Sequence, residues 1–266
     1  MGNSKLKINT IYNEDCIKTM EAMEDNFIDL TVTSPPYDNL RKYNGYSFDF
    51  ENIARHLYRV TKEGGVLVWI VSDATLDGSE TGTSFKQALF FMQCGFNLHD
   101  TMIWCKDGGG AIGSHYTYTQ NFEYMFVFSK GRPKTTNLLY DKVSKSYNGK
   151  GKKIKESRGG FDKDRGTTIF MRREYSKRNN WWLLVPQEQE GSSWHPAVFP
   201  EKLVSDHIVS WSKEGDLVYD PFCGSGTTCK MAARYNRNFI GSEISKEYCE
   251  KSLKRVKNEI IQPQLF

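Results

Sequence analysis

Two short segments, far apart in the sequence, carry side chains that could do chemistry. The first is Ser34-Pro35-Pro36-Tyr37, near the start of the chain, and the second runs from Asp220 to Thr228. Each follows a short run of apolar, β-forming residues, at 28–32 and 216–219. Open α/β sheets keep their ligand sites where strands end, so both segments occupy positions where a ligand site is expected.

The first segment can hold an aromatic amine. Its two prolines fix φ twice and remove two backbone donors, which leaves the Ser34 hydroxyl oxygen and the Pro35 carbonyl as outward acceptors. The Tyr37 ring can stack on a flat base. Two acceptors that pull the hydrogens of an –NH2 group out of plane would aim the nitrogen lone pair at a methyl donor. A simple turn is the alternative interpretation of the same four residues.

The second segment has the features of a nucleoside-binding loop. Gly224 and Gly226 allow a ligand to approach the backbone closely, and a helix that begins near Thr227 offers free N–H groups. Glu243 follows the next strand, where an acid commonly holds ribose hydroxyls. A dinucleotide site is disfavoured because Cys229 stands where GxGxxG requires its third glycine, and no lysine follows the glycines as a P-loop requires.

The elements that must position these segments alternate between strands and helices. Apolar patterns predict strands over 8–12, 28–32, 66–71, 101–104, 124–128, 216–219 and 239–241, and helices over 15–23, 50–61, 83–94, 201–211, 228–235 and 246–260. This alternation predicts an α/β fold with a mostly parallel sheet and helices on both faces. The pattern breaks between Gly131 and Ser193 and returns only briefly at Trp181 and Trp182.

Charge is concentrated in that irregular segment. The whole chain has a net charge of +4, whereas residues 131–180 hold fifteen basic and five acidic residues, so the remainder of the chain is net acidic. A basic segment on an acidic body is suited to a polyanion such as nucleic acid, although a solvated insertion is the alternative. The candidate DNA-binding residues are Lys150, Lys152, Lys153, Lys155, Arg158, Arg172 and Arg173.

Other classes of protein fit less well. The six cysteines form no CxxC pair, which disfavours a structural zinc site and is typical of reduced thiols, and we expect no metal cofactor. The longest apolar runs are too short to span a bilayer, and the polar N-terminus lacks a signal region. We therefore expect a cytoplasmic protein that does not contact a membrane.

Taken together, these motifs resemble the amino-methylating DNA methyltransferases of prokaryotes and their phages. The cofactor loop of that family appears as Asp220-Pro221-Phe222-Cys223-Gly224-Ser225-Gly226-Thr227-Thr228, and its catalytic tetrapeptide as Ser34-Pro35-Pro36-Tyr37. The catalytic motif comes first, the basic segment second and the cofactor motif last, which is the β arrangement of the family. The resemblance covers roughly residues 1–130 and 194–258.

The resemblance implies a Rossmann-like methyltransferase sheet that binds S-adenosylmethionine and is interrupted by a target-recognition insertion. Its expected divisions are a catalytic half (1–130), the insertion (131–193) and a cofactor-binding half (194–266). It places Glu243 at the ribose and Asp15 near the cofactor adenine or the target base. The other implied cofactor-binding residues are Phe199, Pro200, Asp220, Phe222, Gly224, Ser225, Gly226 and Thr228.

By the same resemblance, the chain would flip a base from duplex DNA into the pocket of Ser34 to Tyr37. The serine form of the tetrapeptide favours the 4-amino group of cytosine, while the 6-amino group of adenine is the alternative. Methylation of RNA or of a protein amide, and a non-catalytic DNA-binding role, fit less well. The expected partner is double-stranded DNA, a cognate restriction nuclease is a further candidate, and the chain is expected to be a monomer or a homodimer.

Overall fold

The computed structural model describes residues 6–36, 48–106, 118–144, 153–156, 168–171, 174–185, 194–195, 198 and 200–261. The chain divides into two compact units. One unit comprises Met1–Asn137 together with Asn180–Phe266, and the other comprises Leu138–Asn179. Among the described residues, no helix has the length and apolar character needed to cross a membrane.

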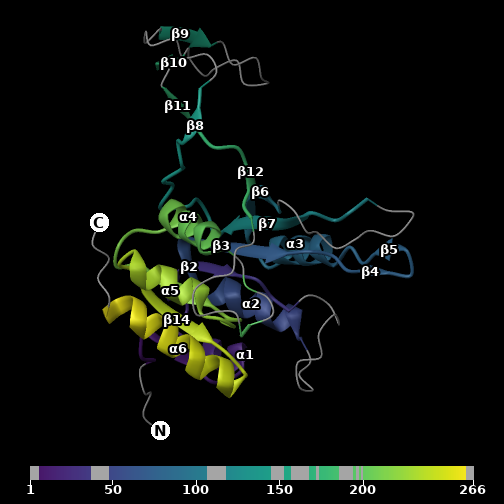
Figure 1. Cartoon of the computed structure of the whole chain (residues 1–266), viewed down its shortest axis with the longest axis vertical. Coiled ribbons are helices and arrows are strands. Elements are labelled where there is room, and N and C mark those ends of the chain that lie inside the picture. The colour runs from purple at the N-terminus through teal and green to yellow at the C-terminus, as the bar shows by residue number, and fades with distance from the viewer. Residues whose placement is uncertain are drawn as a thin grey trace. The chain divides into compact units, whose positions relative to one another are not determined.

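The first unit is built on an eight-stranded sheet (Figure 1). In spatial order its strands are β1 (Thr10–Tyr12), β14 (Asn238–Ser242), β13 (Leu217–Asp220), β2 (Ile28–Thr33), β3 (Thr61–Val71), β7 (Phe122–Ser129), β6 (Asn97–Cys105) and β12 (Trp181–Leu183). Neighbouring strands are parallel except where β7 pairs with β3 and β6. The mostly parallel α/β sheet is confirmed, whereas the reversal of β7 was not predicted.

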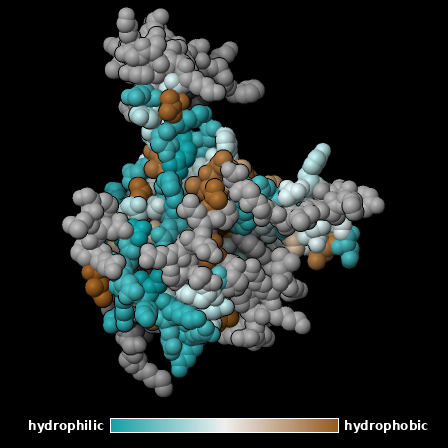
Figure 2. All heavy atoms as spheres, viewed as in Figure 1, coloured by the Kyte–Doolittle hydropathy of each residue, from teal (hydrophilic) through white to brown (hydrophobic). Residues whose placement is uncertain are grey.

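Helices cover both faces of this sheet (Figure 1). On one face lie α4 (Glu201–Trp211), α5 (Thr227–Arg234) and α6 (Lys246–Ile261), and on the other α1 (Cys16–Glu21), α2 (Phe50–Val60) and α3 (Thr83–Gln93). Successive residues of β3 alternate between the two cores: Val68 packs on the first side, and Leu67 and Trp69 on the second. Most of the outer side of α6 is hydrophilic (Figure 2), as expected for a helix with one buried stripe, while Ile260 and Ile261 are exposed at its end.

Asp73, shortly after the end of β3, forms hydrogen bonds with the start of α3. Gly82 precedes this helix with a φ of +61° and offers no side-chain cap. Instead the Asp73 carboxylate accepts hydrogen bonds from the Ser84 N–H at 2.8 Å and the Ser84 hydroxyl at 2.5 Å. A short hairpin of β4 (Thr75–Leu76) and β5 (Ser79–Glu80) connects the two elements. Asp73 therefore satisfies donors that a helix N-terminus leaves open.

The second unit contains two small antiparallel pairs that the sequence pattern did not reveal. β8 (Lys142–Val143) pairs with β11 (Tyr175–Ser176), and β9 (Lys153–Glu156) pairs with β10 (Thr168–Met171). Within the same unit Arg178 forms an ion pair with Asp141 and donates its N–H to the Leu139 carbonyl at 2.8 Å.

We predict that Gln87→Leu destabilises the fold by about 1–3 kcal/mol, because the buried Trp69 indole N–H loses its acceptor. The Gln87 carbonyl oxygen accepts that N–H at 2.8 Å, and Trp69 is fully buried. Urea unfolding measures the change. Gln93→Leu is the matched control, since Gln93 is exposed on the same helix and should change stability little. Equal effects of the two substitutions would contradict this role for Gln87.

Candidate active site

The two motifs lie together at one end of the sheet, where two neighbouring strands finish. β2 and β13 are parallel neighbours, with Tyr219 opposite Thr31, so the residues that follow both strands leave from the same side. The Thr33 hydroxyl donates a hydrogen bond of 2.6 Å to Oδ1 of Asp220. A second link runs from the Thr228 hydroxyl to the Val32 carbonyl, at 3.0 Å. The cofactor loop is therefore fastened to the strand that carries the tetrapeptide.

Asp220 is the most strongly perturbed carboxylate at this edge. Its side chain is almost completely buried, and burial raises its pKa from 3.8 to about 6. Hydrogen bonds from the Thr33 hydroxyl and the Phe222 N–H oppose that rise because they favour the charged form. A carboxylate in this setting can interact strongly with a positively charged ligand, since little water screens it.

The glycines of the loop meet protein neighbours that sequence reasoning missed. Gly224 and Gly226 have φ angles of +48° and +80°, a region that side chains rarely adopt. A Cβ at Gly226 would lie 3.0 Å from the Ser252 Cβ on α6, and one at Gly224 would lie 2.8 Å from the His195 imidazole. Nothing in the sequence spacing identified Ser252 or His195 as partners, so the need for glycine at these positions does not come from a ligand alone.

Glu243 binds the backbone of the cofactor loop at Gly224. Its carboxylate accepts hydrogen bonds from the Gly224 N–H and the Ser245 N–H, each at 2.8 Å. Burial raises the pKa of this carboxyl. Glu243 follows β14, the strand beside β13, so it lies at the same sheet edge as Asp220. Its role at the ribose stays a prediction.

The tetrapeptide directly follows β2. Ser34 and Pro36 are partly buried and Pro35 is buried, while Tyr37 lies outside the described residues. Ser34 is thus held one residue from the Thr33–Asp220 hydrogen bond.

Two other predicted cofactor residues have defined places. The Asp15 side chain accepts the Ile17 N–H at 2.7 Å and caps α1, so at least one of its roles is structural. Pro200 is buried and immediately precedes α4, while Phe199 lies outside the described residues. Of the predicted DNA-binding residues, Lys153 and Lys155 lie on β9; Lys150, Lys152, Arg158, Arg172 and Arg173 lie outside the described residues.

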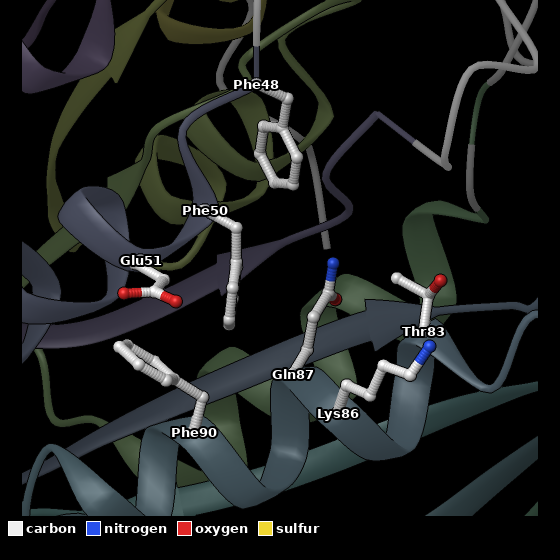
Figure 3. Close-up of a pocket in the computed structure, with 7 residues that line it drawn as sticks. All are labelled: Phe48, Phe50, Glu51, Thr83, Lys86, Gln87 and Phe90. Atoms are coloured by element: carbon white, nitrogen blue, oxygen red, sulfur yellow. The ribbon is translucent and has the colours of Figure 1, made fainter.

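A pocket of about 270 Å³ lies beside the cofactor loop, between the starts of α2 and α3. Figure 3 shows its lining residues, which are Phe48, Phe50, Glu51, Thr83, Lys86, Gln87 and Phe90. Phe48 makes an edge contact with Phe222, with ring centroids 5.7 Å apart. The aromatic wall of this pocket is therefore continuous with the loop. Among the described residues, no cluster of histidine, cysteine or acidic side chains could hold a metal ion.

Residues 28–254 match the N6/N4 methyltransferase family, described as DNA methylase. This chain belongs to that family. It is also 55% identical to the orphan methyltransferase M.BamHII of Bacillus amyloliquefaciens, over 91% of this chain and 93% of that protein. Identity to the Type II methyltransferase M.BglII of Bacillus subtilis is 28%, over 92% of this chain and 68% of that protein.

Solved structures show the same fold at lower identity. The cytosine-N4-specific PvuII DNA methyltransferase has a TM-score of 0.68 and 20% identity, covering 94% of this chain and 90% of its own. A DNA modification methylase of Thermus thermophilus, complexed with S-adenosyl-L-methionine, has a TM-score of 0.62 and 22% identity, covering 94% of this chain and 95% of its own. The chain is a DNA amino-methyltransferase, and the cofactor of its family is S-adenosylmethionine, as the motifs predicted.

We predict that the stability contributed by Asp220 falls as pH rises. Its pKa of about 6 in the folded protein exceeds the ordinary value of 3.8, so the folded state binds the proton more tightly. The contribution is complete below about pH 4 and is lost as pH rises through 6, a difference on the order of 3 kcal/mol. Without cofactor, the wild type should therefore lose stability relative to Asp220→Asn between pH 4 and 7. A constant difference in urea unfolding across this range would contradict the burial argument.

Proposed function

We propose that this enzyme methylates the 4-amino group of cytosine in duplex DNA. The observation that carries the proposal is the position of Ser34, which follows β2 directly and lies next to the hydrogen bond between Thr33 and Asp220. That bond sets the amine-binding tetrapeptide beside the cofactor loop. The 6-amino group of adenine is the alternative target, since it also offers two hydrogens to the same acceptors.

The residues at the sheet edge suit S-adenosylmethionine. Asp220 supplies a buried carboxylate for the positively charged methionine end, and Gly224 and Gly226 present no side chain to a ligand. Glu243 would meet the ribose, and Pro200, with Phe199, would form the opposite wall. When bound, S-adenosylmethionine supplies a methyl group on a positively charged sulfur.

Ser34 and Pro35 would act on the target amine. The Ser34 hydroxyl oxygen and the Pro35 carbonyl accept its two hydrogens, so the nitrogen lone pair points away from the base. Positive charge develops on that nitrogen as the new bond forms, and the two acceptors stabilise it because they are already oriented. The amine then loses one proton to water. Tyr37 would stack on the ring of the flipped base.

The choice of cytosine depends on the serine at position 34. In this family the serine form of the tetrapeptide goes mostly with the 4-amino group of cytosine, and the PvuII enzyme, which shares this fold, is named as cytosine-N4-specific. We further propose that residues 131–193 recognise duplex DNA through their excess of basic side chains. A cognate restriction nuclease, a cytoplasmic location and a monomeric or homodimeric state stay predictions.

We predict that Ser34→Ala lowers the turnover number on the order of 100-fold and leaves S-adenosylmethionine binding nearly unchanged. The substitution removes one acceptor of the developing charge but no predicted cofactor contact. Single-turnover methyl transfer and calorimetry measure the two quantities, with Ser79→Ala in the exposed β4–β5 hairpin as the control. Digestion of the product should yield cytosine methylated on its amino group. Methylated adenine alone would overturn the choice of base, and full activity in Ser34→Ala would overturn the mechanism.

We predict that replacing Lys152, Lys153 and Lys155 by glutamine weakens DNA binding and flattens its salt dependence. Each lost phosphate contact lowers the slope of log affinity against log salt by about 0.9. Replacing Lys246, Lys254 and Lys257, which are exposed on α6, removes the same charge elsewhere and serves as the control. Equal slopes for the two triple variants would indicate that charge alone, rather than contact, sets the affinity.

A further inference from the structure

Helix α6 forms hydrogen bonds with the carbonyl groups of two consecutive residues of the cofactor loop. The Ser252 hydroxyl donates to the Gly224 carbonyl at 2.5 Å, and one turn later the Arg255 guanidinium donates to the Ser225 carbonyl at 3.0 Å. The same Nη1 of Arg255 also donates to the Thr227 hydroxyl at 3.0 Å. The loop is therefore held from outside at the residues that lead into α5.

Holding these carbonyls determines where the loop's donors point. In a trans peptide the C=O and the next N–H point in opposite directions, so a Gly224 carbonyl directed at α6 turns the Ser225 N–H away from α6. The neighbouring donors are used within the protein: the Gly224 N–H bonds to Glu243 and the Gly226 N–H to the Cys223 carbonyl. In the part of the chain that the structure describes, no group accepts the Ser225 N–H. It stays available at the sheet edge where the cofactor is expected.

Arg255 also reaches the opposite wall of the site. Its Nη2 donates to Oε1 of Glu201 at 2.6 Å, and Glu201 is the first residue of α4, directly after Pro200. The Arg255 side chain is only 5% exposed, so its charge interacts at close range with little screening by water. One buried guanidinium therefore connects the cofactor loop to the segment that begins with Pro200.

We propose that Arg255, with Ser252, is a positioning residue for S-adenosylmethionine: it fixes the Ser225 peptide and the separation of the two walls without touching the cofactor. A lysine cannot replace it, because an ammonium is a point charge and cannot make the fork of hydrogen bonds to Ser225, Thr227 and Glu201. This inference rests on the proposed placement of the cofactor against the loop.

An arginine on the other face of the sheet provides a matched control. The Arg59 guanidinium on α2 donates to the Met20 carbonyl at 2.6 Å and to the Met23 carbonyl at 2.9 Å. These bonds join α2 to the end of α1 and involve no residue of the cofactor loop, α4 or α6. Arg59→Lys should therefore reduce stability without moving the cofactor site.

The test is calorimetric titration of S-adenosylmethionine into the full-length protein. Arg255→Lys should weaken binding by roughly 10- to 100-fold, the loss expected for hydrogen bonds to a charged group. Ser252→Ala, a smaller change that retains the buried charge, should weaken binding severalfold. Arg59→Lys should bind as the wild type does even where its melting temperature falls. For Arg255→Lys and Ser252→Ala, the KM for the cofactor should rise more than kcat falls, and the KM for DNA should stay constant.

Two results would overturn the proposal: wild-type affinity in Ser252→Ala and in any folded Arg255→Lys, or an equal loss of affinity in Arg59→Lys, which would indicate general destabilisation. A further variant, Asp220→Asn, distinguishes failure of the positioning role from failure of the proposed cofactor site. If Asp220→Asn weakens cofactor binding and Arg255→Lys does not, the site stands and only the positioning role fails. If neither weakens it, the placement of the cofactor is wrong.

Discussion

The buried hydrogen bond between Thr33 and Asp220 is the interaction on which the rest of the site depends. It joins residues 187 positions apart in sequence and spans the ends of two neighbouring parallel strands. Burial disfavours the Asp220 charge, and the Thr33 hydroxyl offsets part of that cost. Because Ser34 follows Thr33 and the glycine loop follows Asp220, one bond sets side by side the two segments proposed to bind the amine and the cofactor. The Thr228–Val32 contact reinforces this arrangement from the other side of the loop.

Around that bond, residues of α6, α4 and the end of β14 constrain the site. α6 holds the Gly224 and Ser225 carbonyls, α4 brings Glu201 and Pro200 to the opposite wall, and Glu243 binds the Gly224 N–H from the end of β14. Preorganised donors and charges act strongly in a site of this kind because they need not reorient during the reaction. The fold thus restrains the cofactor loop from several directions.

Much of this could be predicted from the sequence, for identifiable reasons. Helix α4 was predicted with its observed bounds because its apolar residues repeat at helical spacing between Pro200 and Ser212. Only the second part of β3 (Thr61–Val71) was predicted, because its run from Val66 to Val71 is uniformly β-forming. The reversal of β7 could not be predicted, since strand periodicity carries no direction. The strands of the pairs β8–β11 and β9–β10 are only two to four residues long, too short to show a clear alternation. Ser252 and Arg255 were not identified from the sequence. A polar residue on a helix, such as an arginine, resembles a solvent-exposed side chain until its partners are known.

A double-mutant cycle between Thr33 and Asp220 tests the central claim most directly. The rate constant kcat/KM for the cofactor would be measured in Thr33→Val, in Asp220→Asn and in the combined variant. If the hydrogen bond joins the two motifs, each single change lowers kcat/KM, and the double variant is little worse than the poorer single one, with a coupling energy of roughly 1–3 kcal/mol. Additive losses would show that the two residues act independently and would contradict the account.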